Sequence, residues 1–226
     1  MIHFLVVVAT FLVVDQILAG KWKLAYSPAI RNIMEHFYNA PHMGEDYFTY
    51  AALYKAAVEN FPSGSHFVEI GAYKGRSSSY LAVEIVNSGK NIKLDCIDSW
   101  DNEDFKRYWN SQEEGLGDGV YKNFVRNISP VRDRINVIKG NSWETANLYK
   151  DNSLDFVFID ADHEYDSVYK DINAWLPKVK KGGLLSGHDY YFDGAYWVGV
   201  RDACDQIFGK GNYSDPWGCK CWVKYL

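Results

Sequence analysis

Short apolar runs alternate with longer segments whose apolar residues recur at helical spacing across residues 64–226. The short runs are typical of buried strands, and the longer segments are typical of helices that cover a sheet. Because strands separated by helices form parallel βαβ units, this order predicts an α/β fold with a mostly parallel sheet and helices on both faces. The predicted strands are residues 66–72, 93–98, 135–138, 154–160 and 182–189. The predicted helices are residues 77–88, 121–128, 143–149, 168–179 and 200–207.

The end of the chain departs from this alternation. Residues 212–216 and then 219–226 follow the last predicted helix, with no helical pattern between them. A connection this short predicts an antiparallel hairpin at the sheet edge. Cys219 and Cys221 fall in its second half, where two alternating strand positions explain them as well as a metal or redox role does.

Helical spacing also marks the N-terminal part of the chain. Ser27 followed by Pro28 is a typical helix start, and apolar residues continue on one face through residue 37. A second helix is predicted around residues 50–57, and a Pro-Ser-Gly-Ser stretch ends it. We therefore expect an N-terminal helical extension over residues 1–63 and a main domain over residues 64–226.

The first residues are unusually apolar. Residues 4–14 form an almost unbroken apolar run, which is too short to span a bilayer. The first lysine, Lys21, follows this run, whereas a secretory signal has its positive charge in front. We expect an element packed on the domain or on a partner chain of a homo-oligomer, although a signal or an anchor stays open. The predicted location is the cytoplasm.

Composition and charge narrow the class of protein. With 226 residues, 47% of them hydrophobic, the chain can bury one substantial core. Its net charge of -5 and the lack of a Lys/Arg block argue against nucleic acid as a main partner. Its four cysteines are too few for a disulfide framework in a chain of this length.

A glycine turn ends the first predicted strand. Glu69, Gly71 and Gly75 lie in this turn, and small hydroxyl residues open the next helix. Glycines let the backbone approach a ligand closely, and a helix start offers unpaired N–H groups, so the turn is typical of a nucleotide-like cofactor site. The dinucleotide fingerprint G-x-G-x-x-G would need a glycine where Tyr73 stands, which disfavours a nicotinamide oxidoreductase.

With this turn, the acids at strand ends and the terminal hairpin, the chain resembles the class I S-adenosylmethionine-dependent methyltransferases. It is most similar to the small-molecule O-methyltransferases grouped with macrocin O-methyltransferase, over roughly residues 64–226. The resemblance implies a Rossmann-like sandwich with a seven-stranded sheet whose last strand is antiparallel. It also implies S-adenosylmethionine as cofactor and, as substrate, a small polar molecule with a hydroxyl group, for which a sugar is one candidate.

The resemblance assigns roles at the strand ends. Glu69 is expected near the methionine ammonium, directly or through water, and Asp98 is expected to accept hydrogen bonds from both ribose hydroxyls. The segment from Asn141 to Trp143 is expected to bind adenine. The predicted cofactor-binding residues are Glu69, Gly71, Ala72, Tyr73, Gly75, Ser77, Asp98, Ser99, Trp100, Asn141, Ser142, Trp143 and Asp160.

Two further strand ends carry acids and histidines. Asp160, Asp162 and His163 follow the fourth predicted strand, and His188 and Asp189 follow the fifth. Acids at neighbouring strand ends suit a divalent ion such as Mg²⁺ or Mn²⁺. Related enzymes have an acid where His188 stands, so a softer metal such as manganese, a base in place of a ligand, and no metal all stay open. The predicted ligands are Asp160, Asp162, His188 and Asp189.

Methyl transfer to a hydroxyl requires in-line positioning and removal of a proton. We expect His188 to be the base, with His163 as second candidate and Asp160 beside them. The aromatic segments 100–119 and 190–197 are expected to shape the substrate pocket, the first as a lid. A rival hypothesis is a non-catalytic module of the same fold that binds S-adenosylmethionine or a protein partner.

Overall fold

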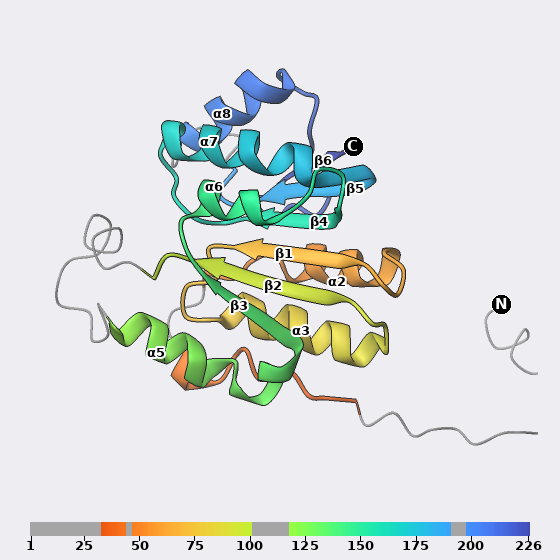
Figure 1. Cartoon of the computed structure of the whole chain (residues 1–226), viewed down its shortest axis with the longest axis vertical. Helices are drawn as coiled ribbons and strands as arrows, with labels where there is room; N and C mark the ends of the chain where they lie inside the picture. Colours follow the sequence, from red (N-terminus) through yellow and green to blue (C-terminus); the bar gives the residue numbers. More distant parts are fainter. Residues whose placement is uncertain (1–32, 44–46, 101–117, 191–197) are drawn as a thin grey trace, which may run out of the picture. The chain divides into compact units, whose positions relative to one another are not determined.

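A computed structural model describes residues 33–43, 47–100, 118–190 and 198–226 (Figure 1). The chain divides into two compact units, Met1–Ile33 and Met34–Leu226, and nearly all described residues belong to the second. The apolar run at residues 4–14 and the predicted helix start at Ser27 lie outside the described residues. The homo-oligomer, the cytoplasmic location and the domain boundary at residue 63 stay predictions.

Helices and strands alternate along the second unit as the hydrophobic pattern predicts. The strands are β1 (His66–Ile70), β2 (Lys93–Asp98), β3 (Ile135–Lys139), β4 (Leu154–Ile159), β5 (Val179–Gly187) and β6 (Trp222–Tyr225). The α-helices are α2 (Ala51–Asn60), α3 (Arg76–Ser88), α5 (Asp118–Asn127), α6 (Ser142–Thr145), α7 (Tyr165–Trp175) and α8 (Val198–Phe208). The 3-10 helices are η1 (Pro41–Met43), η2 (Ser129–Arg134), η3 (Ala146–Leu148) and η4 (Leu176–Lys178).

The strands form one sheet in the order β3-β2-β1-β4-β5-β6. All neighbouring pairs are parallel except β5 and β6, which are antiparallel, as the sequence predicts for the last strand. The chain runs outward from β1 to β3 and then returns to start β4 on the other side of β1. This reversal creates a switch point between β1 and β4, and ligands of open α/β sheets bind at the carboxyl ends of strands beside such a point.

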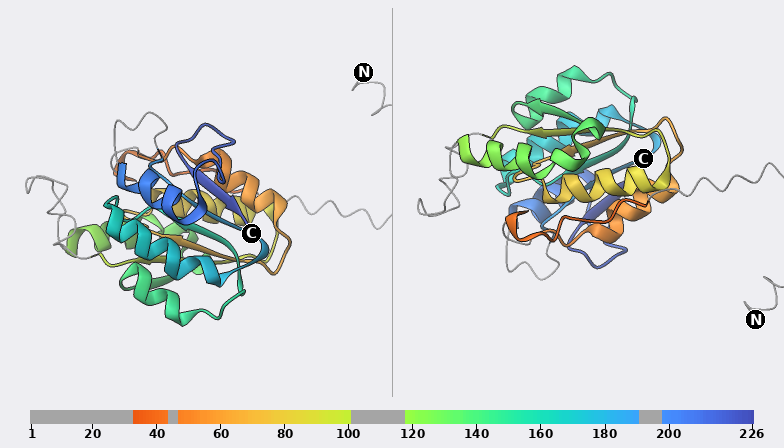
Figure 2. Two further views of the ribbon diagram at one scale, coloured as in Figure 1. Left: turned by 90° about the horizontal axis from the view of Figure 1, so that it is seen from above. Right: turned by 90° about the horizontal axis from the view of Figure 1, so that it is seen from below.

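Helices form two layers that cover the two faces of the sheet (Figure 2), and the buried apolar residues form two clusters. Alternation along each strand produces them: Phe67 faces the layer with α2, α3 and α5, whereas Val68 faces the layer with α6, α7 and α8. Both faces are therefore buried, as expected for parallel strands. No helix in the described part of the chain is long and apolar enough to cross a membrane.

The expected seventh strand is not present among the described residues, which form six strands. The first half of the predicted terminal hairpin is reduced to a single bridge between Ser214 and Val223. The reason is a local turn in which the carboxylate of Asp215 accepts bonds from the backbone N–H groups of Cys219 (3.1 Å) and Lys220 (3.0 Å). These bonds satisfy backbone groups that a longer ladder would otherwise pair.

The predicted N-terminal helix is wrong for residues 33–37, which have no helical structure. The backbone of Met34 instead bonds the side-chain amide of Asn87 on α3, with its N–H donating at 2.8 Å and its carbonyl accepting at 3.0 Å. Tyr38 packs edge-on against Tyr80 of α3, with 5.0 Å between ring centroids. An amide side chain and aromatic contacts thus stabilise an extended segment.

Gly71 follows β1 with a φ of 88°, and a Cβ added there would lie 1.7 Å from the carbonyl oxygen of Asp160. The ends of β1 and β4 therefore approach so closely that no side chain fits. Gly64 has a similar φ of 96°, but a Cβ there would meet nothing within 4 Å. The two glycines share the backbone requirement and differ only in available space.

This difference predicts the effect of Gly71→Ala on the free energy of unfolding. Gly64→Ala, the matched control, should cost roughly 1–2 kcal/mol, because only the left-handed backbone is unfavourable. Gly71→Ala should cost roughly 1–3 kcal/mol more, because β1 and β4 must also separate. Urea denaturation followed by circular dichroism measures both values. Equal losses would show that the contact with Asp160 does not matter for stability.

Candidate functional site

The carboxyl ends of β1, β2, β4 and β5 meet at one edge of the sheet. Gly71 follows β1, Asp98 ends β2, Asp160 follows β4 and His188 follows β5. Backbone bonds join these ends, because Gly71 N–H donates to Ile97 (2.9 Å) and Asp160 N–H donates to Ile70 (2.8 Å). The sheet therefore brings together the strand-end residues that the sequence singles out.

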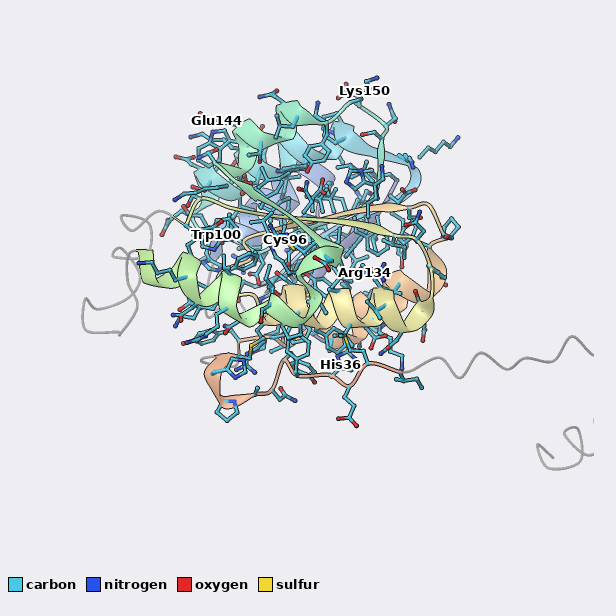
Figure 3. All side chains as sticks on the ribbon, turned by 60° about the horizontal axis from the view of Figure 1, so that its bottom comes forward. His36, Cys96, Trp100, Arg134, Glu144 and Lys150 are labelled. Atoms are coloured by element: carbon cyan, nitrogen blue, oxygen red, sulfur yellow. The ribbon has the colours of Figure 1, made fainter. Side chains whose placement is uncertain are left out.

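Asp98 bonds the backbone of the turn after β1 and the backbone that directly follows β2. Its two carboxylate oxygens accept one backbone N–H each, from Tyr73 at 2.8 Å and from Trp100 at 2.7 Å. The indole N–H of Trp100 also donates to the carbonyl of Tyr73 at 2.9 Å. Figure 3 shows Trp100 beyond the end of the strand that carries Cys96.

Both of these loop residues have a strained backbone. Tyr73 has a φ of 45° and Trp100 a φ of 44°, values in the left-handed region that non-glycine residues rarely adopt. Such strain costs on the order of 1–3 kcal/mol per residue and persists only where surrounding bonds enforce it. Here the Asp98 carboxylate provides those bonds, so its loss would release both loops.

Glu69 lies inside the protein. Its side chain is fully buried and accepts bonds from the hydroxyl of Tyr54 (2.8 Å), the hydroxyl of Ser78 and the thiol of Cys96 (3.3 Å). Burial raises the pKa of this carboxyl, while hydrogen bonds from Ser78 and Ser77 oppose the rise. Both oxygens are thus bonded to the chain's own side chains below the glycine turn, and the predicted role beside an ammonium stays a prediction.

The segment expected to bind adenine begins α6. Asn141 is the N-cap of this helix and accepts from Glu144 N–H at 3.3 Å, while the hydroxyl of Ser142 accepts from the indole of Trp175 at 3.4 Å. Trp143 is half-buried and has the ammonium of Lys170 5.1 Å from its ring centroid. The side chains of Asn141 and Ser142 therefore serve the local fold.

The other predicted cofactor residues lie where the motif implies. Gly71, Ala72, Tyr73 and Gly75 form the turn after β1, Ser77 is buried in the first turn of α3, and Ser99 directly follows β2. The predicted pocket segments 100–119 and 190–197 fall mainly on residues 101–117 and 191–197, outside the described ranges.

Asp160, His163 and Asp189 converge after β4 and β5. One ligand atom from each lies within 4.8 Å of the others, a spacing that can accommodate a metal ion. His163 Nε2 is 2.6 Å from Asp189 Oδ2. Burial opposes a charge on His163, but the hydrogen bond and charge of Asp189 outweigh it and raise its pKa.

Asp162 does not join this group. Its carboxylate accepts from the backbone N–H groups of His163 (2.7 Å) and Glu164 (3.1 Å) and from the hydroxyl of Ser167 (2.7 Å), at the start of α7. Asp162 thereby stabilises the turn that precedes α7 and joins this turn to Ser167 in the first turn of the helix. His163 takes the place that the sequence suggests for Asp162 beside Asp160 and Asp189.

His188 lies beside the carboxylates of Asp160 and Asp189 and is almost fully buried. Its Nδ1 is 3.3 Å from Asp189 Oδ2 and 3.6 Å from Asp160 Oδ1, and its Nε2 is 2.8 Å from the hydroxyl of Thr49. Burial disfavours the charged ring, but Asp160 and then Asp189 outweigh burial and raise the pKa of His188 to about 10. We call Asp160, His163, His188 and Asp189 the strand-end cluster.

Three hydroxyl groups from one short segment complete the site, and the sequence interpretation missed them. The segment enters α2 and bonds residues on β1 and after β4 and β5. Apolar spacing around residues 50–57 predicts only a helix face, whereas the hydroxyls of two tyrosines four positions apart are the signal for these contacts. The pairs are Thr49 with His188, Tyr50 with Asp160 and Tyr54 with Glu69, each at 2.8 Å.

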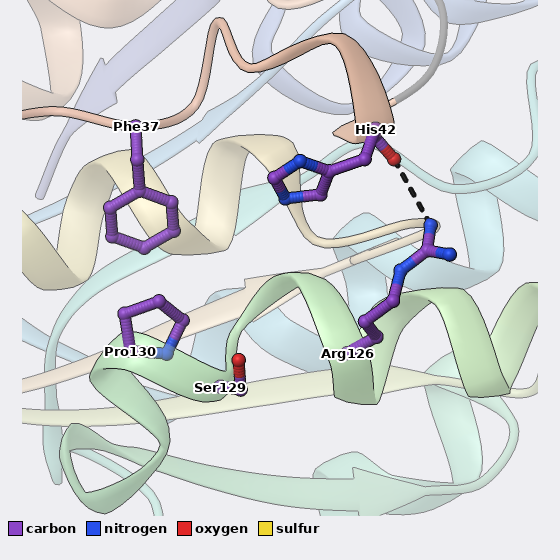
Figure 4. A pocket seen from close by; sticks show the side chains of 5 residues that line it. All are labelled: Phe37, His42, Arg126, Ser129 and Pro130. Atoms are coloured by element: carbon purple, nitrogen blue, oxygen red, sulfur yellow. Dashed lines mark hydrogen bonds between the residues drawn. The ribbon is translucent and has the colours of Figure 1, made fainter.

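A shallow hollow of about 410 Å³ lies elsewhere, between the segment before α2 and the end of α5 (Figure 4). Arg126 at its rim donates to the carbonyl of His42 at 3.1 Å. No predicted site residue contributes to it. The lining residues are Phe37, His42, Arg126, Ser129 and Pro130.

Comparison with known proteins finds a related sequence. The Dictyostelium discoideum protein named probable caffeoyl-CoA O-methyltransferase 3 is 27% identical over 148 residues, 62% of this chain and 51% of that protein. The chain thus spans about half the length of this relative.

Solved structures share the fold at low sequence identity. The O-methyltransferase NovP superposes with a TM-score of 0.57 at 18% identity, covering 79% of this chain and 80% of NovP. The calicheamicin methyltransferase CalS11 superposes with a TM-score of 0.54 at 15% identity, covering 78% of this chain and 77% of CalS11. These likenesses confirm the Rossmann-like methyltransferase fold.

A family model described as a methyltransferase domain matches residues 68–190, more than half of the chain. The match begins within β1 and ends directly after Asp189, so it contains the glycine turn, Asp98 and the strand-end cluster. The chain therefore belongs to the class I S-adenosylmethionine-dependent methyltransferases.

Proposed function

We propose that the protein transfers a methyl group from S-adenosylmethionine to a hydroxyl of a small polar molecule. Its support is that Asp98 and the strand-end cluster lie at the same edge of the sheet. A cofactor bound along this edge would meet Asp98 with one end and the histidines and acids with the other. A sugar or a polar aromatic compound is the acceptor class that we favour.

Asp98 suits the cofactor's ribose. Each of its oxygens accepts one backbone N–H, and a carboxylate oxygen can accept a further bond. Two ribose hydroxyls that reach the end of β2 would find in this carboxylate an acceptor for each. Because the same carboxylate bonds the loops at Tyr73 and Trp100, it would also keep both loops in the conformation that receives the nucleoside.

The strand-end cluster suits removal of the acceptor's proton. Both ring nitrogens of His188 face oxygen acceptors, which favours a ring that carries a proton at each nitrogen. Such a cation would stabilise a developing oxyanion. His163, paired with Asp189 at 2.6 Å, is then the better candidate for the base, and His188, our first expectation, becomes its electrostatic partner.

A divalent cation is a further part of the proposal. Asp160, His163 and Asp189 offer two carboxylates and one imidazole, a donor set that suits Mn²⁺ better than Mg²⁺. When bound, such an ion lowers the pKa of a coordinated hydroxyl. With the ion bound, His163 would be a ligand and no longer the base, so that its loss would remove the ion, and Asp160 and Asp189 would share the ion's charge.

Asp98→Ala is the first test, by calorimetry with S-adenosylmethionine. The affinity should fall about 10- to 100-fold, because hydrogen bonds to a charged acceptor contribute roughly 1.5–3 kcal/mol. Asp151→Ala is the control, since Asp151 is an exposed partner of Lys178. A wild-type protein that does not bind S-adenosylmethionine would contradict the proposed function.

His163→Ala and His188→Ala test the chemistry. Release of S-adenosylhomocysteine is measured across a panel of catechols and monosaccharides. Loss of a general base should lower turnover by about 10²–10⁴-fold with little change in cofactor affinity. His42→Ala, an exposed histidine, should behave as wild type. Cofactor binding without any turnover across the panel would favour the non-catalytic module, and full turnover by His163→Ala would exclude this base.

Mn²⁺ binding tests whether the ion is held by Asp160, His163 and Asp189, or whether Asp162 is a ligand as the sequence predicts. Titration of the chelator-treated protein, followed by electron paramagnetic resonance, should show an ion whose affinity falls at least about tenfold in Asp189→Asn, since a charged ligand is lost. Asparagine tolerates the left-handed φ of 57° at this position. Asp162→Asn should bind Mn²⁺ normally. Equal weakening by both variants would restore Asp162 to the ligand set.

A further inference from the structure

The hydroxyl of Thr49 has two polar neighbours and only one proton to donate. Its oxygen lies 3.0 Å from the carbonyl oxygen of Cys219 and 2.8 Å from His188 Nε2. A carbonyl can only accept, so the Thr49 proton satisfies Cys219. The Thr49 oxygen then has only lone pairs to offer to His188, and Nε2 must donate.

From this arrangement we infer that Thr49 is a positioning residue, which fixes a proton on Nε2 of His188 and directs Nδ1 toward Asp160 and Asp189. A ring without a proton on Nε2 would place the lone pair of Nε2 against the lone pairs of Thr49. In histidine sites, the hydrogen bond at one ring nitrogen decides which chemistry the other nitrogen can perform. Here the Thr49 hydroxyl accepts from Nε2 and leaves Nδ1 to face Asp160 and Asp189.

The carbonyl that receives the Thr49 proton is itself held in place. The N–H of Cys219 donates to Asp215, and the carbonyl of the next residue, Lys220, accepts from Tyr190 N–H at 2.8 Å. Lys220 has a φ of 61°, so the turn is also constrained by a left-handed residue. The terminal turn that replaces the expected hairpin thus provides the fixed acceptor.

The ring of His188 is held from a second direction. It packs against the ring of Tyr50, with 4.8 Å between centroids and 57° between planes, and the Tyr50 hydroxyl donates to Asp160. Burial, followed by the charge of Asp160, keeps the pKa of Tyr50 well above its usual value, so this hydroxyl remains a donor. Neighbouring residues 49 and 50 therefore contact His188 and one of the two carboxylates that face its Nδ1.

The importance of Thr49 for turnover rests on the proposed function, but its hydrogen bond to His188 does not. Thr49 is an exposed residue, so its replacement by valine removes the hydroxyl without opening a cavity in the core. Thr49→Ser keeps the hydroxyl. Thr145→Val is a matched control, because the Thr145 hydroxyl also donates to a backbone carbonyl, that of Ser142, at 2.8 Å.

The test is nitrogen-15 NMR of the full chain labelled at its six histidines, with His188→Gln assigning the His188 signals. Two-bond proton–nitrogen spectra at neutral pH report which ring nitrogen is protonated. We expect a protonated Nε2 in wild type, Thr49→Ser and Thr145→Val. In Thr49→Val its proton should exchange with water at least about tenfold faster, the equivalent of losing a bond of roughly 1.4 kcal/mol.

An unprotonated Nε2 in the wild-type protein would overturn the inference, whether or not Thr49→Val folds. Unchanged exchange in a folded Thr49→Val would overturn it as well. These outcomes are separate from the proposed function: a protein that fails to bind S-adenosylmethionine but shows the Thr49-dependent proton would contradict the function and support the positioning role.

Discussion

The close contact between Gly71 and the carbonyl of Asp160 is the constraint on which the site depends. It brings the ends of β1 and β4 together at the switch point of the sheet, where no side chain fits between them. Backbone bonds from Gly71 to β2 and from Asp160 to β1 extend this contact across three strands. Asp98 and the strand-end cluster can face one ligand only because these ends are in register.

Hydroxyl groups from the segment that enters α2 bond and orient the polar side chains at the strand ends. Buried carboxyl and imidazole groups need hydrogen-bond partners, because an unsatisfied buried polar group costs roughly 1–3 kcal/mol. Tyr54 supplies one for Glu69, Tyr50 for Asp160 and Thr49 for His188. Residues before the matched family region thus orient side chains at the strand ends. They hold the carboxylate of Asp160 and the ring of His188 in fixed positions at the carboxyl ends of the strands.

The sequence predicts the strands, the helices after them and the acids at their ends well, because apolar periodicity reports burial directly. It fails where a single side-chain contact decides the local structure. Asp162 and His163 are adjacent, yet Asp162 bonds the turn before α7 and Ser167, whereas His163 faces Asp189. Thr49 and His188 are 139 positions apart, a separation that no periodic pattern connects. The prediction of a seventh strand is wrong because a single carboxylate, that of Asp215, stabilises a turn in its place.

The most direct measurement of the central claim is a crystal structure of the chain grown with S-adenosylhomocysteine and Mn²⁺. It reports the position of the whole cofactor product relative to every strand end at once. The account predicts the ribose hydroxyls on Asp98, the sulfur directed toward the strand-end cluster, and an ion bound by Asp160, His163 and Asp189. A nucleoside bound away from Asp98, or a sulfur directed away from His163 and His188, would contradict it.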